Sequence, residues 1–156
     1  EISQTSGYNK SSLLAKIAPA CYYGCALLRS NKLLKFDDIE NPNSMEILLK
    51  DVGITSKSFQ FKTECCGAIM SLTHKDLVLK LSKDILEMAY DCKANCIVVF
   101  CQLCQQNLDL RQSQINRYFK TEYKIPVLYL TQILGLALGL SEREVMLDKL
   151  FVSPNI

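Results

Sequence analysis

The chain combines two patterns of apolar and polar residues. Four short stretches are apolar and rich in β-branched or aromatic residues, and they span residues 16–23, 58–62, 96–100 and 126–130. The third stretch reads CIVVF, a continuous apolar run that is typical of a strand buried on both faces of a parallel sheet. Pro19 weakens the first stretch as a strand, because it has no backbone N–H to donate. We predict a strand at each of the four.

Longer stretches repeat their apolar residues at helical spacing. They predict helices over residues 44–52, 73–94, 103–119, 131–138 and 141–151. Gly53 follows the first of them as a suitable C-cap. The pairs Thr73–Asp76 and Ser141–Glu144 have the spacing of a capping box, so each is expected to open a helix.

Strands that alternate with helices predict βαβ units and a mostly parallel sheet. No linker, repeat or low-complexity tract divides the 156 residues, and 49% of them are apolar, enough for one sizeable core. We therefore expect a single α/β domain over residues 1–156, with a core at about 17–150 and a looser segment at 29–43. Its sheet would be four-stranded and Rossmann-like, flanked by helices.

The charge balance narrows the range of partners. The chain has 18 basic and 16 acidic residues, so its net charge of +2 gives no reason to expect nucleic acid or an anionic membrane. The longest strongly apolar run, Ile133–Leu140, has 8 residues, whereas a membrane-spanning helix needs about 20. The first ten residues do not resemble a signal peptide. We expect a cytoplasmic protein without a transmembrane segment.

The cysteines are the most informative residues of the chain. A chain this long and apolar does not need disulfides to hold a core, so a reducing compartment and metal or redox chemistry fit better. Eight cysteines occur: Cys21, Cys25, Cys65, Cys66, Cys92, Cys96, Cys101 and Cys104.

Five of these cysteines follow predicted strands. Cys25 comes after the first strand, Cys65 and Cys66 after the second, and Cys101 and Cys104 after the third. The carboxyl ends of parallel strands lie along one edge of a sheet, where ligands bind in open α/β folds. The five thiols are therefore expected to converge at that edge.

Several kinds of site remain open for these thiols. Cys101-x-x-Cys104 lies at a predicted strand-to-helix turn, which favours the thiolate form of cysteine. The pair could be part of a metal site, a thioredoxin-like dithiol or two incidental cysteines. Zinc usually takes four ligands, often from two such pairs, and a dithiol needs no others, so neither explains the adjacent Cys65 and Cys66. An iron–sulfur cluster explains them better, because its irons are spread over several ångströms and Gly67 lets the backbone turn.

The order of these motifs resembles that of a known family. Tyr23-Gly24-Cys25 is followed after 39 residues by Cys65-Cys66-Gly67, and 34 residues separate Cys66 from Cys101-x-x-Cys104. This pattern resembles the cysteine-rich CCG domain, in particular the second CCG repeat in the B subunit of heterodisulfide reductase. Further similarity lies in residues 23–29, 40–42 and 62–68, within a region of about 17–150. The B subunit carries two CCG motifs, whereas this chain has one.

The resemblance implies an oxidoreductase that acts on sulfur groups. Its cofactor would be a non-cubane 4Fe–4S cluster held by Cys25, Cys65, Cys66, Cys101 and Cys104. The domain would cleave or form the disulfide of a small substrate, within an electron-transfer complex whose other subunits carry flavin or iron–sulfur centres. The alternatives are a thioredoxin-like enzyme that uses Cys101 and Cys104, or a zinc-binding structural or docking domain.

Three further residues are weak candidates for the site. His74 could protonate a leaving thiolate, although a solvated histidine at a helix start is the commoner case. Arg29 and Lys62 are close in sequence to the thiols, so they would raise the reduction potential of a cluster, bind an anionic substrate or be ordinary surface charges. The remaining cysteines are expected to pack in the core: Cys21, Cys92 and Cys96.

Overall fold

A parallel sheet of three short strands lies at the centre of the described residues. The computed structural model describes residues 14–29 and 37–154, apart from the side chains of residues 15, 27 and 29. The strands are β1 (Pro19–Tyr22), β2 (Cys96–Val99) and β3 (Val127–Tyr129). They lie in the order β1-β2-β3, and both pairs are parallel.

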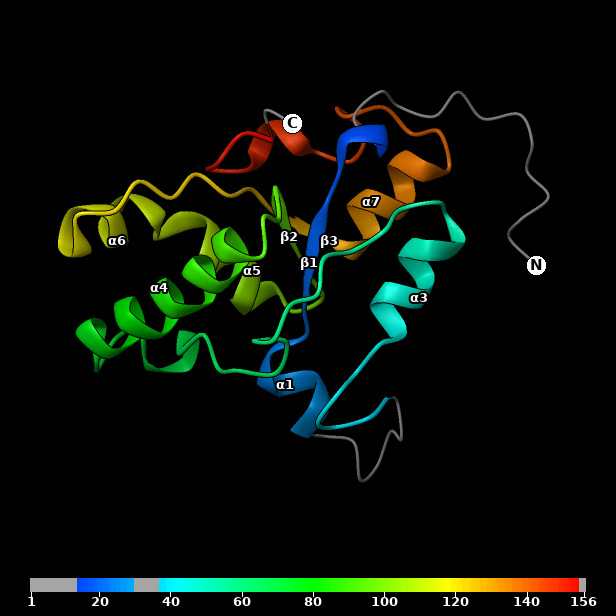
Figure 1. The fold of residues 1–156 in the computed structure, drawn as a ribbon. Coiled ribbons are helices and arrows are strands. Elements are labelled where there is room, and N and C mark those ends of the chain that lie inside the picture. The colour runs from blue at the N-terminus through cyan, green and yellow to red at the C-terminus, as the bar shows by residue number, and fades with distance from the viewer. Residues whose placement is uncertain (1–13, 30–36, 155–156) are drawn as a thin grey trace.

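Helices cover both faces of this sheet (Figure 1). On one side lie α4, α5 and α6, and on the other α3 and α7, while α1 begins just beyond β1. Short 3-10 turns η1, η2 and η3 complete the fold. The bounds are α1 (Gly24–Arg29), α3 (Ser44–Asp51), α4 (Lys75–Asp91), α5 (Gln102–Leu110), α6 (Gln112–Phe119), α7 (Leu130–Ala137), η1 (Leu14–Lys16), η2 (Ala68–Met70) and η3 (Leu147–Lys149).

Alternate residues of the strands enter two separate cores. Cys96 and Val98 of β2 pack with α3 and α7, whereas Ile97 and Val99 pack with α4, α5 and α6. This follows from the period of two in a strand, which sends successive side chains to opposite faces. The predicted α/β domain with a parallel sheet between helices is confirmed.

The second predicted strand, 58–62, was wrong. This stretch lies beside β1, and the carbonyl of Lys62 accepts a hydrogen bond from the amide of Tyr23 at 2.9 Å. A turn at residues 60–61 interrupts it, so no regular ladder forms. Phe59 is nevertheless only 2% exposed and packs in the core on the α4, α5 and α6 side of the sheet. The apolar pattern thus indicated burial rather than a strand.

The predicted helix over 141–151 was also wrong. Its capping box does form, since Glu144 Oε2 accepts from the Ser141 amide at 2.8 Å. Turns and η3 follow instead of an α-helix. The buried carboxylate of Asp109 accepts hydrogen bonds from the amides of Phe151 and Val152, at 2.8 and 3.2 Å. Those amides therefore bond to a side chain of α5 and not to carbonyls of a helix of their own.

Three smaller expectations had mixed outcomes. Gly53 ends α3 as predicted, with φ +85°, and its amide donates to the Lys50 carbonyl. The capping box at Thr73 is absent: α4 begins after His74, and no side chain caps it. The single helix predicted over 103–119 is divided at Arg111 into α5 and α6.

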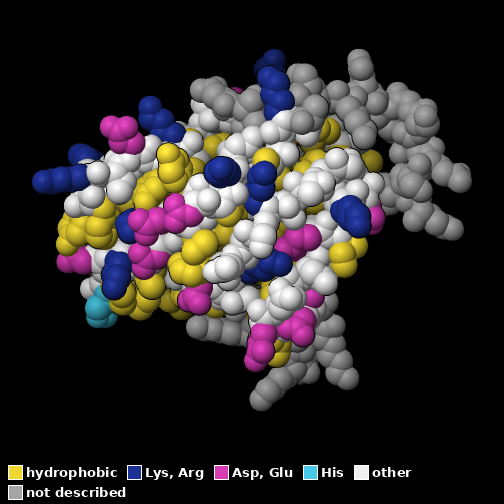
Figure 2. Space-filling view, viewed as in Figure 1, with side chains coloured by type: hydrophobic (Ala, Val, Ile, Leu, Met, Phe, Trp, Pro, Cys, Tyr) yellow, Lys and Arg dark blue, Asp and Glu magenta, His cyan; other side chains and the backbone are white. Residues whose placement is uncertain are grey.

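The surface carries charges of both signs. Basic and acidic side chains are interspersed on the face shown in Figure 2, and hydrophobic ones gather over α4 and α6. In the two described ranges, no helix is both long enough and apolar enough to cross a bilayer.

The buried Asp109 provides a test of this fold. Replacing it in Asp109→Ala leaves the amides of Phe151 and Val152 without their partner, which should lower the free energy of unfolding by about 2 kcal/mol. Urea unfolding would measure the loss, and faster proteolysis of the chain after Asp148 would locate it. Asp91→Asn, at an exposed position at the end of α4, is the control and should change neither. Equal stability of Asp109→Ala and wild type would contradict the assigned role.

Candidate functional site

The carboxyl ends of β1 and β2 bring three thiols to one edge of the sheet. Cys25 lies in the first turn of α1, Cys101 immediately precedes α5, and Cys104 lies in the first turn of α5. Gly24 has φ +65°, and a Cβ on it would lie 3.0 Å from the Sγ of Cys104. The start of α1 therefore packs directly against the α5 thiol, and a side chain at Gly24 would push them apart.

Hydrogen bonds hold the loop that carries the other two thiols against β1. The carbonyl of Lys62 accepts from the amides of Tyr23 and Gly24, at 2.9 and 3.0 Å. The Tyr22 hydroxyl donates to the carbonyl of Glu64 at 2.6 Å. This loop therefore reaches the strand end without being a strand itself.

Adjacent cysteines in this loop contact different partners. The Sγ of Cys65 is 3.7 Å from that of Cys25, and the Sγ of Cys66 is 3.7 Å from that of Cys104. Gly67 follows with φ +76°, and a Cβ on it would lie 3.1 Å from the side chain of Leu81. Gly67 thus permits both the turn after the two thiols and the close approach of α4.

All five predicted thiols come together at this edge. Cys101 lies one helical turn before Cys104, which contacts Cys66, so these three form a row beside the pair of Cys25 and Cys65. Cys66 and Cys104 are buried, whereas the other three are half-buried and form the accessible side. Among the described residues, no disulfide joins any of the cysteines.

This set of donors suits a metal centre with several irons. All five are sulfur atoms, the usual ligands of iron–sulfur clusters. Two thiolates on one tetrahedral ion lie roughly 3.8 Å apart, for metal–sulfur bonds of about 2.3 Å, which is close to the separation in both contacting pairs. Within the described ranges, no three or more His, Cys, Asp or Glu side chains surround a position for a single ion. The thiols are thus grouped as a pair and a row of three.

The row of three favours a thiolate at Cys66. Its pKa is lowered to about 6, chiefly by the hydrogen bond it shares with the Cys104 thiol and also by the amide of Ala68, although burial acts in the opposite direction. The same bond, together with burial, raises the pKa of Cys104. Thiolate is the form of cysteine that binds metals, so this arrangement prepares Cys66 as a ligand.

Buried polar residues support Cys66, and the sequence analysis missed them. Tyr22 lies beneath the thiols, and burial first and their charges second raise its pKa, so the phenol stays protonated. Ser82 of α4 and Asn107 of α5 both bond to the carbonyl of Cys66. A polar residue on the apolar face of a helix could have identified them in the sequence. Ser82 lies among the buried apolar residues of α4. Asn107 lies three residues after Cys104, among the buried residues of α5.

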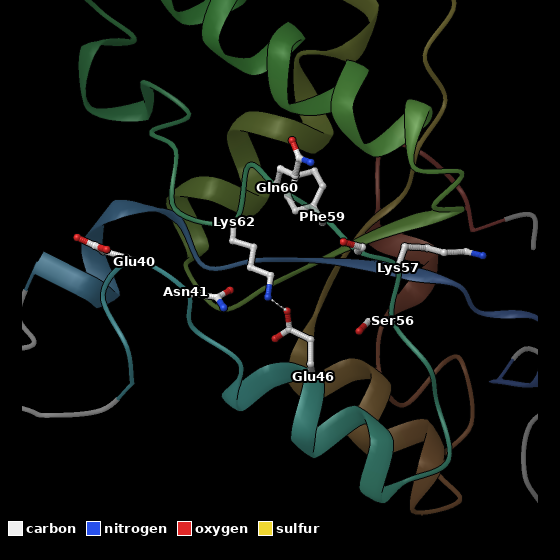
Figure 3. Close-up of a pocket in the computed structure, with 9 residues that line it drawn as sticks. Glu40, Asn41, Glu46, Ser56, Lys57, Phe59, Gln60 and Lys62 are labelled. Carbon is white, nitrogen blue, oxygen red and sulfur yellow. Dashed lines mark ion pairs between the residues drawn. The ribbon is translucent and has the colours of Figure 1, made fainter.

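Lys62 uses its charge away from the thiols, in an ion pair. Its Nζ lies 2.5 Å from Glu46 Oε1 and donates to the carbonyl of Pro42 at 3.0 Å. The second carboxylate oxygen of Glu46 accepts from the Tyr23 hydroxyl. Figure 3 shows Lys62 and Glu46 facing each other in a cavity of about 480 Å³. The cavity is lined by Glu40, Asn41, Glu46, Ser56, Lys57, Ser58, Phe59, Gln60 and Lys62.

The other weak candidates add little to the site. His74 is exposed, and its ring Nδ1 lies 2.9 Å from the hydroxyl of Thr73. The side chain of Arg29 lies outside the described residues.

The three remaining cysteines lie in the cores, as expected. Cys21 and Cys96 are buried on the α3 and α7 side of the sheet, and burial raises the pKa of both, that of Cys96 to about 12. Cys92 is half-buried, and its thiol donates to the carbonyl of Ala89 at 3.2 Å. High pKa values keep the first two as inert thiols.

Known proteins of similar sequence are subunits of reductases. Over 135 residues the chain is 34% identical to the 8-methylmenaquinol:fumarate reductase membrane anchor subunit of Wolinella succinogenes, covering 86% of this chain and 48% of that protein. Over 132 residues it is 33% identical to the B subunit of the ferredoxin:CoB-CoM heterodisulfide reductase of Methanosarcina mazei, covering 83% and 44%. The chain spans about half the length of the curated relatives it matches.

The family comparison covers the site itself. The model of the cysteine-rich domain CCG matches residues 19–109, more than half of the chain, from the start of β1 to the second half of α5. All five converging thiols lie within that match. The chain therefore belongs to the family of cysteine-rich CCG domains and is homologous to the B subunit of heterodisulfide reductase.

Proposed function

We propose that this chain is an iron–sulfur redox domain of the heterodisulfide reductase type. Its cofactor is a non-cubane 4Fe–4S cluster, and its reaction is the reductive cleavage, or the formation, of a disulfide within a multi-subunit complex. The observation that carries this proposal is the convergence of five thiols from three chain segments at one sheet edge. These thiols are the proposed ligands: Cys25, Cys65, Cys66, Cys101 and Cys104.

The unequal burial of the thiols supports a role in chemistry with a small substrate. Cys66 and Cys104 hold the inner side of the site away from water, while Cys25, Cys65 and Cys101 face an accessible side. A bound cluster would supply electrons and a Lewis-acidic iron for sulfur. Cleavage of a disulfide RSSR′ takes up two electrons and two protons and releases RSH and R′SH. A partner subunit with flavin or iron–sulfur centres provides the electrons.

A second candidate is electron transfer without disulfide chemistry. The relative from Wolinella succinogenes supports it, because the name of that protein states a quinol and fumarate as reactants and no disulfide. Both candidates give the domain a redox role within a reductase complex. The dithiol alternative has less support, because it uses Cys101 and Cys104 alone, whereas Cys66 lies 3.7 Å from Cys104.

Apolar residues around the site support a partner subunit that docks close to it. Ile69 and Leu72 follow the Cys65–Cys66 pair and are 87% and 100% exposed. Ile69 lies in η2, which contacts α5, whose first turn exposes Leu103. Exposed apolar residues gathered next to a functional site are typical of an interface. Docking there would bring a donor near the thiols.

Analysis of iron and sulfide tests the cluster. The full chain, purified without oxygen, should hold about four irons and four acid-labile sulfides, the content of one 4Fe–4S cluster. Cys66→Ser should lose most of both, because it removes a thiolate from the buried row. Cys92→Ser changes a half-buried thiol outside the site and should keep both. Zinc without iron in such a preparation would refute the cluster.

Release of thiols separates the two candidate reactions. We expect the chain that holds its cluster, once reduced by a viologen, to cleave CoB–CoM heterodisulfide or a simple alkyl disulfide. Each molecule of disulfide should yield two thiols. A thiol-specific reagent measures them, and protein without iron is the control. A cluster that is reduced and reoxidised without any release of thiol would favour electron transfer over disulfide cleavage.

A further inference from the structure

Cys25 and Cys65 form an accessible pair among the five converging thiols. Their sulfurs lie 3.7 Å apart, and both side chains are half-buried. The amide of Gly67 donates to the Cys65 sulfur at 3.4 Å, which fixes the position of this sulfur. A disulfide needs about 2.0 Å between its sulfurs, so only a short approach by side-chain rotation separates this contact from a covalent bond.

Backbone hydrogen bonds keep the two segments that carry these thiols together. Cys25 lies in the first turn of α1, and Cys65 lies in the loop that begins at Lys62. The carbonyl of Lys62 accepts from the amides of Tyr23 and Gly24, just before Cys25. These bonds involve no cysteine side chain, so they hold the two sulfurs near each other whether or not the thiols bind iron.

The other cysteine pairs at this edge are less suited to oxidation. Cys66 and Cys104 are also 3.7 Å apart, but they are only 3% and 5% exposed, so a reagent in solution does not reach either sulfur. Cys101 is half-buried, yet the neighbouring Cys104 is enclosed and contacts Cys66. The adjacent Cys65 and Cys66 contact different partners. Cys25 and Cys65 therefore combine accessible sulfurs with a direct contact.

We propose that Cys25 and Cys65 are a modification site in the chain before its cluster is assembled, and that small-molecule disulfides such as oxidised glutathione are the substrates. One thiol attacks the disulfide RSSR, forms a mixed disulfide with one R group and releases RSH. The second thiol attacks the protein sulfur of that mixed disulfide and releases the other RSH. The two cysteines lose two electrons, RSSR gains them, and both thiol protons leave with the RSH products.

The modification controls the assembly of the cluster. It removes two of the five proposed ligands, because a sulfur in a disulfide is no longer the thiolate that binds a metal. Excess RSH reverses the exchange and returns both ligands. This consequence rests on the proposed function, whereas the formation of the disulfide does not.

Peptide mass spectrometry of the full chain tests the site. The chain is freed of iron by a chelator, reduced without oxygen and incubated with oxidised glutathione, and its remaining thiols are alkylated. We expect a disulfide between Cys25 and Cys65, with two molecules of reduced glutathione released for each disulfide formed. Cys21 and Cys66 lie in the same tryptic peptides as these residues, so fragmentation of the linked peptides assigns the bond.

Iron uptake measures the consequence. The oxidised chain should bind less than about a tenth of the iron that the reduced chain binds, because two of its ligands are blocked. Treatment with dithiothreitol should restore the uptake. Equal uptake by the oxidised and reduced chains would overturn the proposed control of assembly.

Single substitutions confirm the linkage. Cys25→Ser should keep glutathione on Cys65 as a mixed disulfide, because the thiol that would displace it is missing. Cys104→Ser should form the Cys25–Cys65 disulfide as the wild type does, which separates this pair from a dithiol of Cys101 and Cys104. Cys92→Ser changes a half-buried thiol outside the site, and as the matched control it should also form the disulfide.

The outcomes distinguish this inference from the proposed function. A wild-type linkage of Cys101 or Cys66 to Cys104 would overturn the inference. A linkage of Cys65 to Cys66, or a chain that stays fully reduced in excess oxidised glutathione, would do the same. These results leave the proposed function intact, because iron and sulfide are measured on the untreated chain. A chain that forms the Cys25–Cys65 disulfide but binds no iron when reduced would refute the proposed function and keep the modification site.

Discussion

The site depends on the hydrogen bonds that hold the Lys62–Gly67 loop against the end of β1. The carbonyl of Lys62 accepts from two successive amides at the strand end, and the Tyr22 hydroxyl donates to the carbonyl of Glu64. Among the described residues, no strand ladder holds this loop in place of these bonds. These bonds set where the loop thiols lie relative to Cys25.

Glu46 connects the same two segments from the other side of the sheet. Its carboxylate pairs with the Lys62 ammonium and accepts from the Tyr23 hydroxyl, so one α3 side chain holds both chain segments next to their cysteines. The pair is largely enclosed, which makes removal of either charge more costly than at the surface. The candidate role of Lys62 in the site is thus one of support, through its carbonyl and its ion pair.

The alternation of strand side chains explains how one edge serves two purposes. Tyr22 faces the α4, α5 and α6 side and lies beneath the thiols, whereas Tyr23 faces α3 and binds Glu46. Adjacent residues at the end of β1 therefore support the site from opposite faces of the sheet.

The sequence by itself determined most of the elements and the ligand candidates. A continuous apolar run such as CIVVF specifies a buried strand locally, and the order of the five cysteines after such runs indicated both their convergence and the CCG family. The tertiary structure alone decided the rest, because it depends on contacts between residues distant in sequence. Asp109 binds the amides of Phe151 and Val152 in place of a helix. Cys66 is positioned by Asn107, 41 residues away, and no local pattern encodes such a bond.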